Sequence, residues 1–163
     1  MSTSPEATHG TGQSVTPFKL KADHCGISVP DLEASIVWYC DMLGFSVEQR
    51  FALDAVPFKA AFLRRGDFRI ELFEVAGAAP LPEERRHPNQ DLRTHGTKHI
   101  AFVVQDVRAV FTELKQRGVD VAMDVFVVEG IGPGGFIRDN AGNLIELLER
   151  QDRVAYNEGG ISS

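Results

Sequence analysis

The stretch that decides the fold is Lys98-His99-Ile100-Ala101-Phe102-Val103-Val104-Gln105-Asp106. An earlier stretch has nearly the same pattern: His24-Cys25-Gly26-Ile27-Ser28-Val29-Pro30-Asp31. The two histidines and the two aspartates are separated by one interval, 99 − 24 = 75 and 106 − 31 = 75. A second pair of stretches, Ile70-Glu71-Leu72-Phe73-Glu74 and Ile145-Glu146-Leu147-Leu148-Glu149, keeps that interval, 146 − 71 = 75. The chain is therefore an internal duplication with a histidine and a glutamate marked in each copy.

Each copy predicts the same order of elements. In the first, a strand over about 20–29 precedes a helix capped by Asp31, whose carboxylate can accept a hydrogen bond from an unpaired N–H of the first turn. Apolar residues then recur at helical spacing as far as Gly44, and three short strands follow over about 45–50, 57–64 and 68–75. The second copy repeats this order after Asp106. The sequence predicts an α+β fold made of two strand-helix-strand-strand-strand units.

The predicted boundaries follow from composition. Residues 1–18 are polar and predict a disordered tail, and 151–163 form a second polar tail. Between them, 19–150 predict a single domain, with module one over 20–75, a Pro- and Ala-rich connection over 76–96 and module two over 97–150. The histidines of the connection, His87 and His95, have no counterpart in the other copy, so we expect surface side chains.

Charge and hydropathy exclude several classes of partner. The formal net charge of −6 and the absence of a basic stripe argue against nucleic acid. No run approaches the roughly 20 apolar residues that cross a bilayer, and no secretory signal is evident, so we expect no membrane partner. Cys25 and Cys40 fall inside a predicted strand and helix rather than in a disulfide framework. We expect a cytoplasmic protein.

The glycine run 130–135 also has a structural interpretation. A nucleotide-binding glycine loop opens a helix whose N-terminus holds phosphate, whereas this run opens a strand and contains Pro133. We therefore expect a hairpin loop.

The four marked residues admit two interpretations. A lone strand histidine is usually a hydrogen-bonded core residue, and a lone strand glutamate usually faces solvent. Glu71 and Glu146, however, each lie between apolar residues in a strand that the pattern indicates is buried. Two buried carboxylates without a cation carry a heavy desolvation cost, which a bound metal removes. Two imidazoles and two carboxylates suit a divalent ion, so we favour a metal site made by His24, Glu71, His99 and Glu146.

On these motifs, together with Val29-Pro30-Asp31-Leu32 and Gly142-Asn143-Leu144-Ile145-Glu146-Leu147, the chain resembles the vicinal oxygen chelate superfamily. That superfamily includes glyoxalase I, methylmalonyl-CoA epimerase, extradiol dioxygenases and fosfomycin or bleomycin resistance proteins. The resemblance implies paired βαβββ modules whose strands form a curled mixed sheet around a metal cleft, with helices on the outer face. It also implies one divalent metal per chain (Ni, Zn, Co, Mn or Fe), a small substrate with adjacent oxygens that chelate it, and a homodimer.

The ligand set is similar to that of bacterial glyoxalase I and differs by one exchange from that of the epimerases. This similarity implies a metal-dependent lyase or isomerase that abstracts a proton next to a carbonyl through a metal-stabilised enediolate, with Glu71 or Glu146 as the catalytic base. Ser28 stands where glyoxalase I has an arginine, which puts a glutathione substrate in doubt. Lys59 lies on the strand where the epimerases carry a glutamate base, and it could instead bind a substrate carboxylate.

Two alternatives remain: a non-haem iron dioxygenase and a ligand-sequestering resistance protein without turnover. The substrate, the identity of the base and whether the cleft forms within one chain or across a dimer stay open.

Overall fold

The protein is described here by a computed structural model that covers residues 20–53 and 57–150. The two predicted tails, 1–18 and 151–163, lie outside the described residues. None of the described helices is long and apolar enough to cross a membrane.

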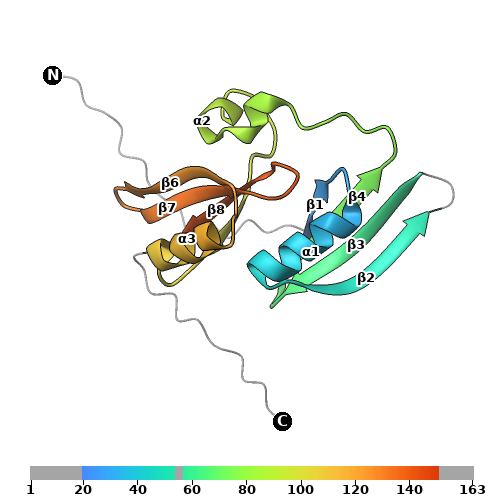
Figure 1. Cartoon of the computed structure of the whole chain (residues 1–163), viewed down its shortest axis with the longest axis horizontal. Coiled ribbons are helices and arrows are strands. Elements are labelled where there is room, and N and C mark those ends of the chain that lie inside the picture. Colours follow the sequence, from blue (N-terminus) through green and yellow to red (C-terminus); the bar gives the residue numbers. More distant parts are fainter. Residues whose placement is uncertain (1–19, 54–56, 151–163) are drawn as a thin grey trace, which may run out of the picture.

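The described chain contains the predicted pair of modules (Figure 1). Module one consists of β1 His24–Ser28, α1 Leu32–Leu43, β2 Ser46–Leu53, β3 Phe58–Arg65 and β4 Phe68–Val75. Module two consists of β5 Ile100–Val103, α3 Val107–Gln116, β6 Val121–Val128, β7 Gly132–Arg138 and β8 Leu144–Leu148. The connection holds two short helices, η1 Glu83–Arg86 and α2 Pro88–Asp91. The α+β prediction and the order of elements are confirmed.

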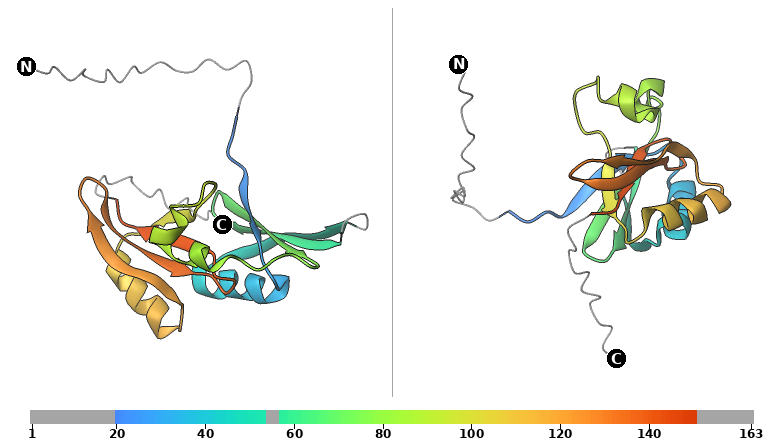
Figure 2. Two further views of the ribbon diagram at one scale, coloured as in Figure 1. Left: turned by 90° about the horizontal axis from the view of Figure 1, so that it is seen from above. Right: turned by 90° about the vertical axis from the view of Figure 1, so that its left-hand side faces the viewer.

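Each module builds its own mixed sheet, and the two sheets stay separate and open. The strand orders are β1-β4-β3-β2 and β5-β8-β7-β6, so β1 and β5 occupy equivalent edges. Each edge strand runs parallel to the last strand of its module, and the other neighbours are antiparallel. One helix covers one face of each sheet, as the two views in Figure 2 show. The opposite face of each sheet is the face on which the marked residues lie.

The two main helices begin in the same way. Asp31 and Asp106 accept hydrogen bonds from the N–H groups of Ala34 and Ala109, both at 2.9 Å, as the sequence predicts. A second acceptor reaches each helix from the end of the last strand of its module, within β4 in module one and directly after β8 in module two. Glu74 Oε2 accepts from Leu32 N at 2.9 Å, and Glu149 Oε2 accepts from Val107 N at 3.4 Å. The final glutamate of each repeated stretch therefore anchors a helix N-terminus.

Helix α1 ends at Gly44, whose φ of 65° is the left-handed conformation that glycine adopts at little cost. The apolar stripes predicted for the two helices are buried against the sheets. The buried members are Leu32, Ile36, Tyr39, Leu43, Val107, Phe111 and Leu114.

The modules are joined by a buried contact between α1 and the turn after β7. The Tyr39 hydroxyl donates to Asp139 Oδ2 at 2.9 Å, and the two residues are 0% and 4% exposed. Beside them, Asn140 Nδ2 donates to Ser35 Oγ at 3.1 Å. One apolar core extends across this junction. The contact fixes how the two sheets are oriented.

Candidate metal centre

The structure brings the marked residues together in two pairs, one in each module. His24 Nε2 lies 3.2 Å from Glu71 Oε2, and His99 Nε2 lies 3.1 Å from Glu146 Oε2. Each pair lies on the sheet face opposite the helix, because alternate residues of a strand share a face. The two glutamate side chains are only 16% and 23% exposed, so both carboxylates are partly withdrawn from water.

The surroundings of the pairs are also equivalent. Phe62 on β3 and Phe136 on β7 each face the neighbouring glutamate's backbone across the sheet. The ring of each phenylalanine meets the imidazole of its module edge-on, with centroids 5.1 Å apart in both cases. These rings shield one side of each pair from water and strengthen electrostatic interactions there.

The separations suit two ligands of one ion. Two atoms that each bind a metal at about 2.1 Å lie about 3.0 Å apart at a right angle and about 3.4 Å apart at the tetrahedral angle. The observed 3.2 and 3.1 Å fall between these values. Each pair is a hydrogen-bond or ion-pair contact whose spacing would also allow its two atoms to bind one ion.

Within one chain the two halves do not merge. Over residues 20–53 and 57–150, no group of three or more His, Cys, Asp or Glu side chains is placed to hold a metal ion. Each module supplies two donors, and the four expected ligands do not form one cluster in a single copy.

Module one carries a further carboxylate that the sequence prediction missed. Asp23 Oδ2 lies 2.8 Å from His24 Nδ1, and Asp23 Oδ1 lies 3.1 Å from Arg69 Nη1. The hydrogen bond from His24 is the main cause that lowers the pKa of Asp23. Arg69 also donates to Glu48, and that hydrogen bond lowers the pKa of the Glu48 carboxyl. The sequence does contain a sign of this difference between the modules. Asp23 directly precedes His24, whereas Lys98 directly precedes His99.

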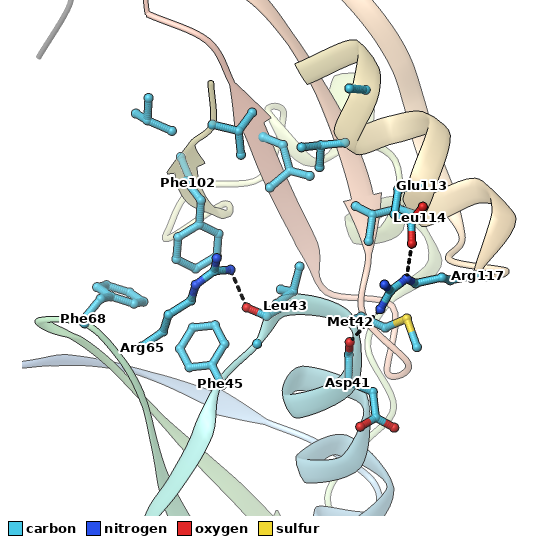
Figure 3. A pocket seen from close by; sticks show the side chains of 18 residues that line it. Asp41, Met42, Leu43, Phe45, Arg65, Phe68, Phe102, Glu113, Leu114 and Arg117 are labelled. Atoms are coloured by element: carbon cyan, nitrogen blue, oxygen red, sulfur yellow. Dashed lines mark hydrogen bonds and ion pairs between the residues drawn. The ribbon is translucent and has the colours of Figure 1, made fainter. Parts of the chain in front are cut away.

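A large pocket lies elsewhere, at the junction of the modules (Figure 3). Its volume is about 1040 Å³, and apolar side chains such as Phe45, Phe68 and Phe102 dominate its wall. Arg117 Nη1 donates to the Asp41 carbonyl at 3.3 Å, and Arg65 donates to the Leu43 carbonyl. Both arginines thus satisfy carbonyls at the C-terminal end of α1. None of the four expected metal ligands lines this pocket.

The remaining polar candidates lie away from the pairs. His87 contacts Glu83 at 3.1 Å on the surface, and His95 is exposed, as expected. Lys59 faces the helix side of its sheet, where its amine lies 3.2 Å from Glu74 Oε1. Lys59 is therefore directed away from Glu71.

The glycine run belongs to the hairpin between β6 and β7, and its last four residues open β7. The expectation of a hairpin loop is confirmed.

The described chain thus consists of two βαβββ modules, and a His–Glu pair lies on the open face of each sheet. The family model described as "Glyoxalase/Bleomycin resistance protein/Dioxygenase superfamily" matches residues 21–147, and the chain belongs to this family.

The relatives include proteins of known and unknown role. The chain is 32% identical to the Escherichia coli "Uncharacterized protein YaeR", over 78% of this chain and 94% of that protein. It is 26% identical to mouse mitochondrial methylmalonyl-CoA epimerase, over 78% of this chain and 71% of the epimerase. It is 28% identical to a probable lactoylglutathione lyase of Vibrio parahaemolyticus, over 83% of this chain and 95% of the lyase.

The fold is similar to that of a glyoxalase family protein from Enterococcus faecalis. The TM-score is 0.68 at 23% identity, over 79% of this chain and 97% of that one. The relatives described above include a methylmalonyl-CoA epimerase and a probable lactoylglutathione lyase.

Proposed function

We propose that the protein is a metal-dependent lyase or isomerase that removes a proton from carbon next to a carbonyl group. The observation that carries the proposal is the equivalence of the two His–Glu pairs, with donor separations of 3.2 and 3.1 Å. A structural histidine or a solvated glutamate explains any one of these residues. Neither explanation accounts for a His–Glu pair at the equivalent place in each of the two modules.

In this proposal His24, Glu71, His99 and Glu146 together hold one divalent ion per chain, of the kind Ni, Zn, Co, Mn or Fe. The bound ion supplies Lewis-acid stabilisation of the negative charge that develops on a substrate oxygen. The substrate is a small molecule with two adjacent oxygens, which suits an ion that keeps positions open for exchange.

The glutamates supply the proton chemistry. A carboxylate oxygen of Glu71 or Glu146 takes the proton from the carbon next to the carbonyl and returns it to the same or the adjacent carbon. The ring of Phe62 or Phe136 excludes water from one side of the reacting carbon.

The separation of the pairs within one chain supports a homodimer. Each chain offers one pair on the sheet of module one and one on the sheet of module two, and two copies can place the first pair of one chain against the second pair of the other. Such a dimer has two complete centres and keeps the ratio of one ion per chain. We place it in the cytoplasm, since both cysteines are free thiols.

A mixing experiment tests the shared centre. His24→Ala and His99→Ala should each lose bound metal, with His87→Ala as the control because that histidine lies on the surface. Mixing the two deficient variants and letting subunits exchange should restore metal binding, since a mixed dimer has one intact centre. Centres formed within single chains cannot be rescued in this way. Full metal content in both single variants would show that the ligand assignment is wrong.

The reaction is tested by isotope exchange. Metal-loaded protein in deuterated water is incubated with 2-oxo thiohemiacetals, acyl-CoA thioesters and 2-hydroxy ketones. The expected result is metal-dependent deuterium uptake at the α-carbon that is lost in Glu71→Gln or Glu146→Gln. Oxygen consumption with ring cleavage of a catechol, without exchange, would instead assign a dioxygenase. Tight binding of an intact ligand with neither reaction would assign a sequestering protein.

A further inference from the structure

A chain of charged side chains runs behind His24 and ends on the ring nitrogen that faces away from Glu71. His24 Nδ1 lies 2.8 Å from Asp23 Oδ2. Arg69 Nη1 donates to the other oxygen of Asp23 at 3.1 Å. Arg69 Nη2 in turn donates to Glu48 Oε1 at 2.8 Å, and Arg64 Nη1 donates to the same oxygen at 3.2 Å. The carboxylate behind the imidazole is itself held by a guanidinium.

This contact determines what the imidazole presents to Glu71. A neutral imidazole carries one ring proton, and the nitrogen without it has the lone pair that can bind a metal. Asp23 Oδ2 accepts a hydrogen bond from Nδ1–H, and this tautomer leaves the lone pair on Nε2. Nε2 is the atom 3.2 Å from Glu71 Oε2. The ring is therefore aimed, and its tautomer selected, by a residue that lies outside the donor set.

The second module lacks this arrangement. At the interval of 75 residues, Lys98 stands in place of Asp23 and Leu144 in place of Arg69. The Lys98 amine is turned away to Asp91, 3.1 Å from its Oδ1. A feature that only one copy keeps is not required by the βαβββ fold, because the other copy folds in the same way without it.

We infer that Asp23 is a positioning residue for His24, and that Arg69 and Glu48 hold Asp23 in place. The inference rests on the proposed metal site and adds an asymmetry to it. The imidazole of module one is held by a carboxylate on the ring nitrogen that faces away from its glutamate, and among the described residues no such carboxylate lies against His99. An outer carboxylate of this kind typically changes metal affinity by about 10- to 100-fold. Asp23 is 62% exposed, so water competes for the hydrogen bond and we expect about tenfold.

The first measurement needs no metal. Nitrogen-15 NMR of the histidine rings at about pH 9, where imidazoles are neutral, should show the His24 proton on Nδ1. In Asp23→Ala the proton should shift towards Nε2, where Glu71 becomes the acceptor, and the His99 ring should not change. Asp67→Ala is the matched control, because it removes the same charge from an aspartate on the surface of module one.

The second measurement is zinc affinity, by competition with a chromophoric chelator. Asp23→Ala should bind zinc about tenfold more weakly than wild type, and Asp23→Asn should recover part of the loss, because an amide oxygen still accepts from Nδ1. Asp67→Ala should bind as wild type does. A wild-type ring protonated on Nε2, or an Asp23→Ala ring indistinguishable by NMR from that of Asp67→Ala, overturns the inference. Equal zinc affinities of Asp23→Ala and Asp67→Ala, when wild type binds zinc, overturn it as well. Wild-type protein that binds none of Ni, Zn, Co, Mn and Fe, but whose His24 ring responds to Asp23 as described, instead overturns the proposed metal centre and leaves the ring positioning established.

Discussion

The hydrogen bond between Tyr39 and Asp139 makes a quantitative test of the module junction. Tyr39→Phe removes one hydroxyl from a fully buried site and leaves the ring in place, so no cavity forms. A hydrogen bond to a charged acceptor contributes about 1.5–3 kcal/mol to stability. Asp139 keeps three other donors: Ala141 N, Asn143 N and Asn143 Nδ2, at 2.9, 2.8 and 2.9 Å. The carboxylate is therefore not stranded, and we expect a loss at the lower end, about 1.5–2 kcal/mol.

The pH dependence provides a second signature. Burial is the main cause that raises the pKa of Tyr39 well above its ordinary value, and the charge of Asp139 adds to it. A raised pKa in the folded state means that the neutral hydroxyl stabilises the fold below about pH 10, and that this contribution falls as the pH rises further. The stability difference between wild type and Tyr39→Phe should therefore shrink above about pH 10, by up to about 1.4 kcal/mol per pH unit.

The assay is equilibrium unfolding in urea, followed by circular dichroism and by the fluorescence of Trp38, whose ring lies 5.0 Å from that of Tyr39. In a domain of this size the loss corresponds to roughly 3–8 °C in melting temperature. Equal stability of the two proteins at neutral pH, or a difference that grows in alkali, would refute the role assigned to this contact.

Three further predictions concern stability. Gly135→Ala should lower the free energy of unfolding by about 1–3 kcal/mol, because a Cβ there would lie 2.5 Å from the Phe111 ring and 3.1 Å from the Met123 carbonyl oxygen; an unchanged urea midpoint would contradict this. The hydrogen bond from Leu32 N lowers the pKa of Glu74, so its carboxylate stabilises the fold at neutral pH and ceases to do so as the pH falls. Glu74→Gln should therefore melt below wild type at about pH 7, and the gap should narrow as the pH falls into the acidic range; a gap that does not change with pH would exclude the carboxylate. Zinc at about 100 times its dissociation constant should stabilise wild type by about 2.7 kcal/mol and His99→Ala by much less; equal shifts would point to binding elsewhere.

The repeat predicted much of this structure because it marks positions that both modules need. The aspartates that cap the helices and the His–Glu pairs on the open faces occur in both copies, so one interval revealed them all. The repeat could not reveal how the modules are oriented, since that depends on contacts that occur once. Tyr39 is such a case: Leu114 stands at the equivalent place, 39 + 75 = 114, and cannot donate a hydrogen bond.

Asp23 was missed for the same reason. It lies where the two copies differ, and a comparison of the copies draws attention to what they share. Its contact with His24 spans adjacent residues and is set by the direction of the two side chains, which alternation along a strand does not specify. The separation of the two half-sites in one chain likewise depends on tertiary packing and not on residue spacing.

The two glutamates of each repeated stretch also protect the fold against misalignment. On β4, Glu71 faces the open side of the sheet while Glu74, three residues on, reaches the N-terminus of α1. A slip of β4 by one residue would reverse both side chains, burying one carboxylate under the helix and leaving the helix terminus without its acceptor. In each module, a one-residue register shift of the last strand would therefore be unfavourable for two separate reasons. A strand that pairs in the wrong register during folding loses its helix anchor and its place beside the histidine at once.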